Sequence, residues 1–261
     1  MRHLLSQATL RTVVLLAAAL GTVGAASLGP RPPVDDEESQ WSWYGGDPGG
    51  SRHTTLAQIS RDNVGELRTA WTYRTGELGA GFARAEKLAF EATPILVRGS
   101  LFLSTPTNIV IALDPATGAE RWRYDPKIDR ALHYSEATSR GVSSWIDPTA
   151  DPAAPCSHRI LTGTLDARLI ALDGRTGRLC ASFGNRGIVD TTQGVRFTER
   201  GDYLLTSPPA IYRDLAIIGS AIGDNRAVEL ERGVVRAFDI RTGALVWSWD
   251  PIPTTDREAA A

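Results

Sequence analysis

The apolar positions of this chain form short runs between turn residues. Runs such as Ile109–Leu113 and Arg168–Leu172 each lead into a turn that contains Asp, Thr and Gly. Outside the first thirty residues, no stretch keeps the 3.6-residue apolar period of an amphipathic helix. Short β-branched runs bounded by turn residues are typical of β-strands. The pattern therefore predicts an all-β protein.

Further apolar runs occur in pairs around short polar turns. The pairs are Pro94–Val97 with Leu101–Ser104, and Ile211–Tyr212 with Leu215–Gly219. Two strands separated by two or three turn residues are the pattern of a β-hairpin. Each pair therefore predicts a hairpin.

A motif of the form Ala-φ-Asp-x-x-Thr-Gly occurs three times. Its aspartates, Asp114, Asp173 and Asp239, are 59 and 66 residues apart. An Asp side chain can accept hydrogen bonds from backbone N–H groups two or three residues later, and the Gly can adopt the positive φ of a tight turn. The motif therefore predicts a hairpin turn, and its long period indicates that each copy belongs to a whole supersecondary unit.

Large aromatic residues follow these turns at fixed positions. Trp122 follows the first copy and Trp247 the third, whereas Ala181 stands at this position in the second. The aromatic residues two positions further on are Tyr124, Phe183 and Trp249. A strand that follows each turn would carry both positions on one face.

About four strands in each 60-residue unit are typical of antiparallel propeller blades, and a β-sandwich is the alternative.

The N-terminus predicts export. Arg2 and Arg11 precede the apolar run Val13–Leu20, and small residues follow at Val23–Ala26. The expected division is a signal peptide at residues 1–26, a linker at residues 27–40 and a folded domain at residues 41–261. An uncleaved membrane anchor is the alternative for the first segment. In either case we expect the folded domain to be periplasmic.

Charge and cysteine content limit the classes of function that the chain can have. The net charge is -2 and no cluster of Lys or Arg is present, which argues against a nucleic-acid-binding protein. Export leads to an oxidising compartment, where Cys156 and Cys180, the only two cysteines, can form a disulfide. The alternative is two buried free thiols. The four histidines have no metal-ligand spacing relative to these cysteines, which argues against a metal site there.

The repeat and its tryptophan resemble the tryptophan-docking motif of the pyrroloquinoline-quinone (PQQ) dependent dehydrogenases. The segments Trp43–Arg52 and Ala70–Gly76 are similar to the start of the mature domain in that family. Within the family, Cys156-x-His158 and Thr206–Pro209 resemble the glucose, quinate and sugar-alcohol branch. Methanol-type members carry two adjacent cysteines before the cofactor arginine, where this chain has Ser135–Ser139. The resemblance implies an eight-bladed β-propeller, of which this chain supplies about three to four blades.

The resemblance also implies cofactor-binding residues. Glu91 would bond a polar edge of the quinone, Arg140 would donate to the quinone oxygens, and Thr206 would lie against PQQ, with Gly223 in the same site. A guanidinium beside the quinone would stabilise negative charge that develops during hydride transfer. The alternatives are a solvated carboxylate for Glu91, a loop salt bridge for Arg140 and a turn-capping hydroxyl for Thr206.

A calcium site follows from the same resemblance. Asp224 and Asn225 match the family's calcium-ligating segment, and Ca²⁺ prefers oxygen ligands and acts as a Lewis acid. An ordinary turn is the alternative for this pair. Glu136 stands where sugar-oxidising members often carry a histidine in the substrate pocket, so the substrate stays open among sugars, polyols and alcohols.

The resemblance implies an oxidoreductase with a respiratory-chain electron acceptor, a quinone or a cytochrome c, and association with the membrane is a further expectation. The family's catalytic base comes from later blades, so no catalytic residue is assigned to this chain and we expect it to be a truncated form that is inactive alone. The alternative is a non-catalytic periplasmic propeller that acts as an assembly or binding scaffold.

Overall fold

The computed structural model describes residues 40–77, 88–195, 199–223 and 233–252. The chain divides into two units after Pro33, and every described residue belongs to the second. The expected signal peptide, residues 1–26, and the expected linker up to residue 39 lie outside the described residues. In the described part, the one helical segment is a 3-10 turn, η2, at Val64–Glu66, and no helix there is long and apolar enough to cross a membrane.

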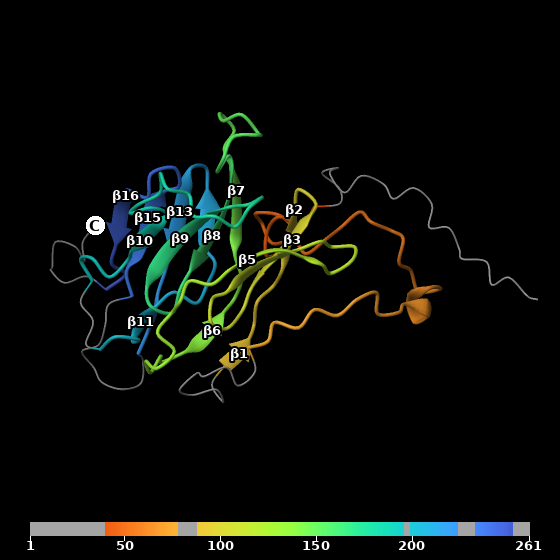
Figure 1. Cartoon of the computed structure of the whole chain (residues 1–261), viewed down its shortest axis with the longest axis horizontal. Helices are drawn as coiled ribbons and strands as arrows, with labels where there is room; N and C mark the ends of the chain where they lie inside the picture. The colour runs from red at the N-terminus through yellow and green to blue at the C-terminus, as the bar shows by residue number, and fades with distance from the viewer. Residues whose placement is uncertain (1–39, 78–87, 196–198, 224–232, 253–261) are drawn as a thin grey trace, which may run out of the picture. The chain divides into compact units, whose positions relative to one another are not determined.

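Three four-stranded antiparallel sheets follow one another along the chain (Figure 1). The first contains β2 (Ile95–Val97), β3 (Ser100–Ser104), β4 (Val110–Leu113) and β5 (Glu120–Tyr124). The second contains β7 (Ser143–Ile146), β8 (His158–Gly163), β9 (Arg168–Asp173) and β10 (Ile188–Asp190). The third contains β12 (Ala210–Tyr212), β13 (Leu215–Ile218), β15 (Val235–Asp239) and β16 (Leu245–Trp249). In each sheet, neighbouring strands are consecutive among the sheet's own strands, which is the predicted meander, and both predicted hairpins are present.

Two short strand pairs join segments outside these sheets. β1 (Leu88–Phe90) pairs in parallel with β6 (Ala137–Ser139), and β11 (Tyr203–Leu204) pairs antiparallel with β14 (Ala221–Ile222). The parallel pair brings together the segments that precede β2 and β7. It therefore sets the relative position of the first two sheets.

The repeated Asp-x-x-Thr-Gly turns have the predicted hydrogen bonds. Oδ1 of Asp114 accepts from the backbone N of Ala116 at 3.0 Å and of Thr117 at 2.9 Å. The same bonds recur around Asp173, and Asp239 accepts from the residue three positions later. Each motif glycine has a φ between 69° and 74°, which an L side chain adopts only with strain.

Tryptophans of one segment pack on the turn glycines of the next. A Cβ added to Gly118 would lie 2.5 Å from the ring of Trp71, and one added to Gly177 would lie 2.6 Å from the ring of Trp122. The two indole N–H groups donate to turn carbonyls three residues before these glycines, at Pro115 and Gly174, both at 3.1 Å. One repeated contact therefore joins the Trp71 segment to the first sheet and the first sheet to the second.

The second copy of the motif differs from the prediction of a strand through Ala181 and Phe183. The chain instead turns after Cys180, and the fourth strand of this sheet is β10. Phe183 is fully buried in the core between the second and third sheets, not on a strand face. The physical reason is that Cys180 is bound to Cys156, which confirms the predicted disulfide, with a Cα–Cα distance of 5.8 Å.

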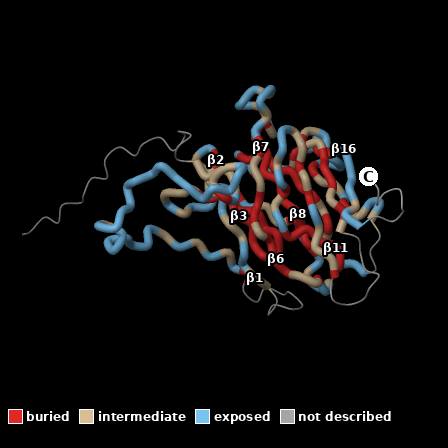
Figure 2. The backbone as a smooth tube through the Cα atoms, turned by 180° about the vertical axis from the view of Figure 1, so that it is seen from behind, coloured by how far each residue is buried: buried red, intermediate tan, exposed pale blue. Residues whose placement is uncertain are grey.

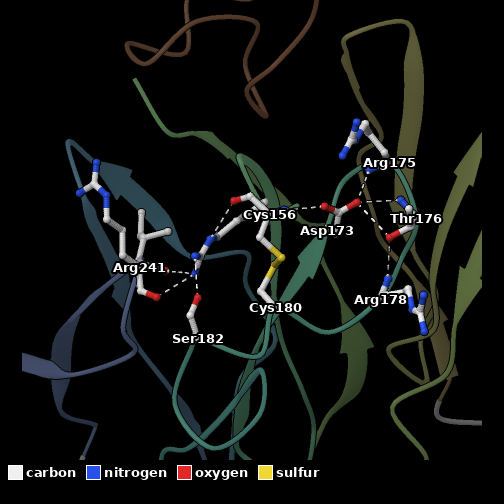
Figure 3. The surroundings of a disulfide bond; sticks show 10 residues. Cys156, Asp173, Arg175, Thr176, Arg178, Cys180, Ser182 and Arg241 are labelled. Atoms are coloured by element: carbon white, nitrogen blue, oxygen red, sulfur yellow. Dashed lines mark hydrogen bonds between the residues drawn. A yellow bond between two sulfur atoms is a disulfide. The ribbon is translucent and has the colours of Figure 1, made fainter. Parts of the chain in front are cut away.

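Polar groups replace the missing tryptophan at this junction (Figure 3). Arg159 Nη1 donates to the carbonyl oxygens of Ile240 at 2.7 Å and Arg241 at 3.0 Å in the third turn, and Nη2 donates to Ser182 Oγ at 3.0 Å. The backbone N of Gly184 donates to the carbonyl of Thr242 at 2.8 Å. The second and third sheets are thus joined by an arginine and a loop that the disulfide holds in place.

Buried residues, red in Figure 2, are concentrated in the sheets, and their apolar side chains form cores that neighbouring sheets share. On β8, Ile160 belongs to the core shared with the first sheet and Leu161 to the core shared with the third. Both faces of the second sheet are therefore buried, because successive residues of a strand point to opposite faces. In contrast, all five residues of β16 are exposed.

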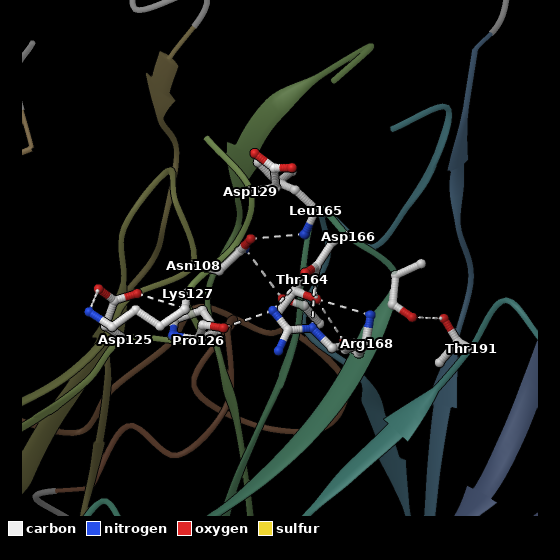
Figure 4. Close-up of polar contacts among 12 residues, drawn as sticks. Asn108, Asp125, Pro126, Lys127, Asp129, Thr164, Leu165, Asp166, Arg168 and Thr191 are labelled. Atoms are coloured by element: carbon white, nitrogen blue, oxygen red, sulfur yellow. Dashed lines mark hydrogen bonds and ion pairs between the residues drawn. The ribbon is translucent and has the colours of Figure 1, made fainter. Parts of the chain in front are cut away.

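Polar bonds also join the first two sheets (Figure 4). The fully buried side chain of Asn108 donates to the carbonyl of Gly163 at 3.3 Å and accepts from the backbone N of Leu165 at 2.8 Å. Arg168, held by Asp166, donates to the carbonyl of Pro126 at 2.8 Å. These bonds join the β3–β4 turn and the segment after β5 to the second sheet.

Candidate functional site

Three of the proposed cofactor-binding residues occupy equivalent places in the fold. Glu91, Arg140 and Thr206 each lie three or four residues before the first strand of a sheet, namely β2, β7 and β12. Because the three sheets are successive copies of one unit, their preceding segments lie side by side. The repeat therefore brings together residues that are up to 115 positions apart in the sequence.

Backbone hydrogen bonds hold these segments in register. In the parallel pair of β1 and β6, Phe90 lies opposite Ser139, so Glu91 and Arg140 follow at the same level. The backbone N of Arg140 donates to the carbonyl of Thr206 at 2.8 Å, and its carbonyl accepts from the backbone N of Thr93 at 3.3 Å. The segment that contains Arg140 therefore lies between the segments that contain Glu91 and Thr206.

The guanidinium of Arg140 connects the side chains of the site. Nη1 donates to Thr206 Oγ1 at 2.7 Å, and Nη2 lies 2.5 Å from Glu136 Oε1 and 3.2 Å from Glu91 Oε2. The salt-bridge alternative for Arg140 is thus present, with two carboxylates. A guanidinium has five N–H donors, so Arg140 keeps Nε–H and further Nη hydrogens for a ligand.

A cavity of about 470 Å³ opens at this cluster. Its lining residues are Tyr44, Glu91, Arg140, Ser207 and Pro208. Thr206 is buried beneath it, whereas the side chains of Arg140, Glu91 and Glu136 are 39%, 44% and 39% exposed. The hydroxyl of Thr206 is therefore fixed by the fold, and the charged groups face the cavity and solvent.

The remaining proposed site residues are placed differently. Gly223 is buried and follows β14, whose Ile222 pairs with Tyr203, and it is not among the described residues that line this cavity. Asp224 and Asn225 lie outside the described residues. In the described part of the chain, no group of three or more His, Cys, Asp or Glu side chains is arranged to hold a metal ion.

Sequence reasoning did not foresee several contacts of this site. The i,i+4 spacing of Glu136 and Arg140 is a contact signal only in a helix, and this segment is a loop and a strand. The buried hydroxyl of Ser139, the residue before Arg140, is hydrogen-bonded to the hydroxyl of Ser104 at 2.7 Å. Tyr44 and Ser207 also line the cavity, and no residue pattern in the sequence marks them as lining residues.

The family of the chain follows from a comparison with known proteins. The sequence model of the PQQ family, described as the glucose/ethanol/alcohol dehydrogenase β-propeller domain, matches residues 41–261. The chain belongs to this family. The predicted resemblance and the predicted all-β propeller class are thereby confirmed, with three four-stranded sheets of an incomplete propeller in the described residues.

Relatives in this PQQ family include sugar and polyol enzymes. The chain is 37% identical to the quinoprotein glucose dehydrogenase of Escherichia coli over 224 residues, which are 84% of this chain and 28% of that protein. It is 35% identical to the quinate/shikimate dehydrogenase (quinone) of Acinetobacter baylyi over 241 residues, 85% of this chain and 29% of the relative. The chain therefore spans less than a third of the length of these relatives.

Solved structures of the same family have the same fold. The crystal structure of the quinohemoprotein alcohol dehydrogenase from Comamonas testosteroni superposes with a TM-score of 0.65 and 29% identity, over 84% of this chain and 28% of that one. The quinohemoprotein alcohol dehydrogenase ADHIIG from Pseudomonas putida gives a TM-score of 0.64 and 31% identity, over 84% and 27% of the two chains. The three sheets thus correspond to propeller blades of PQQ dehydrogenases.

Proposed function

We propose that this chain forms part of a PQQ-dependent dehydrogenase that oxidises a hydroxyl group of a sugar, polyol or alcohol. The observation that carries the proposal is the Arg140 cluster: a guanidinium bonded to Thr206, Glu91 and Glu136 beside a cavity of about 470 Å³. A scaffold propeller has no need for such a cluster at the start of successive blades. The cluster therefore favours the enzyme over the scaffold alternative.

The residues of the cavity fit PQQ, which is a planar quinone with carboxylates. Arg140 supplies unused N–H donors for quinone or carboxylate oxygens, and Ser207 adds a hydroxyl. Glu91 can accept from a ring N–H. Thr206 fixes one side of the guanidinium, so that it needs little reorganisation when the ligand binds.

The chain's own residues would stabilise negative charge on the ligand and hold Arg140 in position. When bound, PQQ supplies an ortho-quinone that accepts the hydride equivalent from the substrate carbon. The positive charge of Arg140, held in place by Thr206 and the two carboxylates, stabilises negative charge on neighbouring oxygens. We assign no general base among the described residues, so proton removal from the substrate is left to parts of the dehydrogenase outside them.

Calcium binding is the part of the proposal that rests on sequence alone. Asp224 and Asn225 offer oxygen ligands, which suit a hard cation. They lie outside the described residues, so no step of the reaction is derived through this ion. Removal of calcium by a chelator is expected to weaken PQQ binding.

We also propose a periplasmic location, association with the membrane and electron transfer to a quinone or a cytochrome c. The proposals rest on the apolar run Val13–Leu20 with the small residues after it, and on relatives named for quinone and haem. N-terminal sequencing of the protein recovered from a periplasmic extract tests the location. A mature terminus near residue 27 supports it, and retention of Met1 in the cytoplasm overturns it.

Binding and turnover of the 261-residue protein test the proposed function. PQQ retained after ultrafiltration with the folded protein, and not with urea-unfolded protein, supports the cofactor site. Turnover with glucose, glycerol, quinate or ethanol and an artificial electron acceptor is expected to be absent, because loss of a general base alone removes about two to four powers of ten in rate. Turnover within about tenfold of a complete relative would show that the chain contains the base. Absence of any PQQ retention would remove the support for the site.

A further inference from the structure

A second cavity lies between the first two sheets, at the opposite end of their first strands from the Arg140 cluster. Glu91 precedes β2, whereas Arg98 follows it, and Arg98 lines this second cavity of about 470 Å³. The two cavities share no lining residue. The second cavity is also built from two sheets that the structure describes completely, so its lining does not depend on other blades.

Three arginines line this cavity: Arg98 from the β2–β3 turn, Arg121 from β5 and Arg175 from the turn after β9. The other lining residues are Gln40, Val97, Ser100, Phe102, His158 and Gly174. None of these described lining residues is acidic. The lining residues therefore carry a net positive charge, which Asp114 offsets in part at Arg121, and each arginine comes from a different element.

The arginines retain unused hydrogen-bond donors. Arg98 has no ion pair or hydrogen bond from its guanidinium among the described residues, and Arg175 donates only to the carbonyl of Ala153, at 2.8 Å. Arg121 donates to Ser100 Oγ at 2.5 Å and to Asp114 at 2.9 Å. A guanidinium has five N–H groups, so all three have donors left for an anion.

Buried and packed side chains form the floor of the cavity. His158 is buried, its Nε2 lies 2.9 Å from Ser144 Oγ, and its ring stands edge-on to Phe102 with centroids 5.8 Å apart. Burial, and after it the charge of Arg98, lowers the pKa of His158 to about 4, so the ring is neutral at pH 7. The positive charge of the cavity therefore resides on arginines above a preformed floor, a favourable arrangement for a bound anion.

We propose that this cavity is an anion site that takes a phosphate-type oxyanion. A tetrahedral phosphate oxyanion offers oxygens in several directions, which suits guanidinium groups from three elements better than one planar carboxylate does. The same chemistry is offered by free inorganic phosphate and by the headgroup of an anionic phospholipid. The proposal does not depend on the proposed dehydrogenase function.

Calorimetric titration of the protein with inorganic phosphate, at constant ionic strength and pH 7.5, tests the site. We expect saturable binding with one site per chain. The double variant R98Q/R175Q should raise Kd about tenfold or more, because it removes two charge-assisted donors. The matched control is R61Q/R186Q, which removes two exposed arginines elsewhere; Arg186 has a φ of 53°, near the 46° of Arg98, so backbone strain is similar.

Two further variants separate folding and the cofactor site from this result. S100D places a carboxylate beside Arg121 and should also abolish phosphate binding while it leaves the arginines in place. R140Q should leave phosphate binding unchanged, since Arg140 belongs to the other cavity. Circular dichroism of each variant checks that the sheets are intact.

Co-sedimentation with vesicles distinguishes the two sources of the anion. Binding of free phosphate that is lost in R98Q/R175Q supports a soluble ligand. Binding to phosphatidylglycerol but not phosphatidylcholine vesicles, lost in the same variant and kept in R61Q/R186Q, supports a lipid headgroup. Binding to neither probe, or equal loss in the control variant, overturns the proposal.

Discussion

The contact between Trp122 and Gly177 gives a quantitative test of how successive blades are joined. Gly177→Ala adds a Cβ that would lie 2.6 Å from the indole ring, at a backbone φ of 69°. The ring is buried, and its N–H is held by the carbonyl of Gly174 at 3.1 Å. Neither the ring nor the turn can move away without loss of a contact.

Two costs add at this position. An alanine at positive φ costs about 1 to 2 kcal/mol. Overpacking against a fixed ring adds about 1 to 3 kcal/mol. Gly177→Ala is therefore expected to lower the free energy of unfolding by about 2 to 5 kcal/mol.

Gly194→Ala is the matched control, because Gly194 has a φ of 74° and no atom of the described residues lies within 4 Å of an added Cβ. It should show only the backbone cost, about 1 to 2 kcal/mol. Urea unfolding followed by tryptophan fluorescence measures both variants. Equal losses in Gly177→Ala and Gly194→Ala would refute the packing of Trp122 on the turn.

Three further predictions concern the second blade and its neighbours. Replacement of Cys156 and Cys180 by Ser should lower the free energy of unfolding by about 3 to 4 kcal/mol, from a sequence separation of 24 residues in the chain-entropy model; an unchanged urea midpoint would contradict this. The free energy of unfolding should fall as pH drops from 6.5 to 4. Burial lowers the pKa of His158 in the folded state to about 4, so in this pH range the unfolded state binds a proton at His158 that the folded state does not. His158→Gln should flatten that pH dependence in urea titrations, and an equal slope in the variant would exclude His158 as its source. Arg159→Met should lower the free energy of unfolding by about 2 to 4 kcal/mol, since it leaves the carbonyls of the third turn without a donor, and a loss below 0.5 kcal/mol would contradict the inter-blade role.

Local features of the fold could be predicted from the sequence because their causes are local. The Asp side chain of each repeat bonds N–H groups within three residues, and the motif glycine closes the turn without other partners. The hairpins around Arg98 and Arg213 follow from runs that are adjacent in the chain. The order of strands in the first and third sheets therefore needed no long-range information.

The second motif copy was predicted wrongly because long-range contacts override its pattern. The disulfide of Cys180 and the bond from Gly184 to Thr242 turn the chain where alternation predicts a strand. Ala181 marks the place, but no local signal shows that Arg159 takes over the inter-blade contact. That role depends on the third turn, more than 80 residues away.

In the candidate site too, some features could be predicted from the sequence and others depend on long-range contacts. The resemblance singled out Glu91, Arg140 and Thr206, and the repeat explains why they meet. The contact between Arg140 and Thr206 spans 66 residues, and the double ion pair with Glu136 and Glu91 depends on side-chain placement that only the folded chain shows. The roles of Gly223, Asp224 and Asn225 stay predictions.

The affinity of the 261-residue protein for PQQ, measured by quenching of tryptophan fluorescence, tests the central claim most directly. Arg140→Gln should raise Kd about 10- to 100-fold, because it removes charge-assisted donors from the cavity. R98Q/R175Q should leave Kd unchanged, which excludes uptake of the anionic cofactor by the other arginine-lined cavity. Equal affinity of Arg140→Gln and the unaltered protein would contradict the assignment of this cluster as the cofactor site.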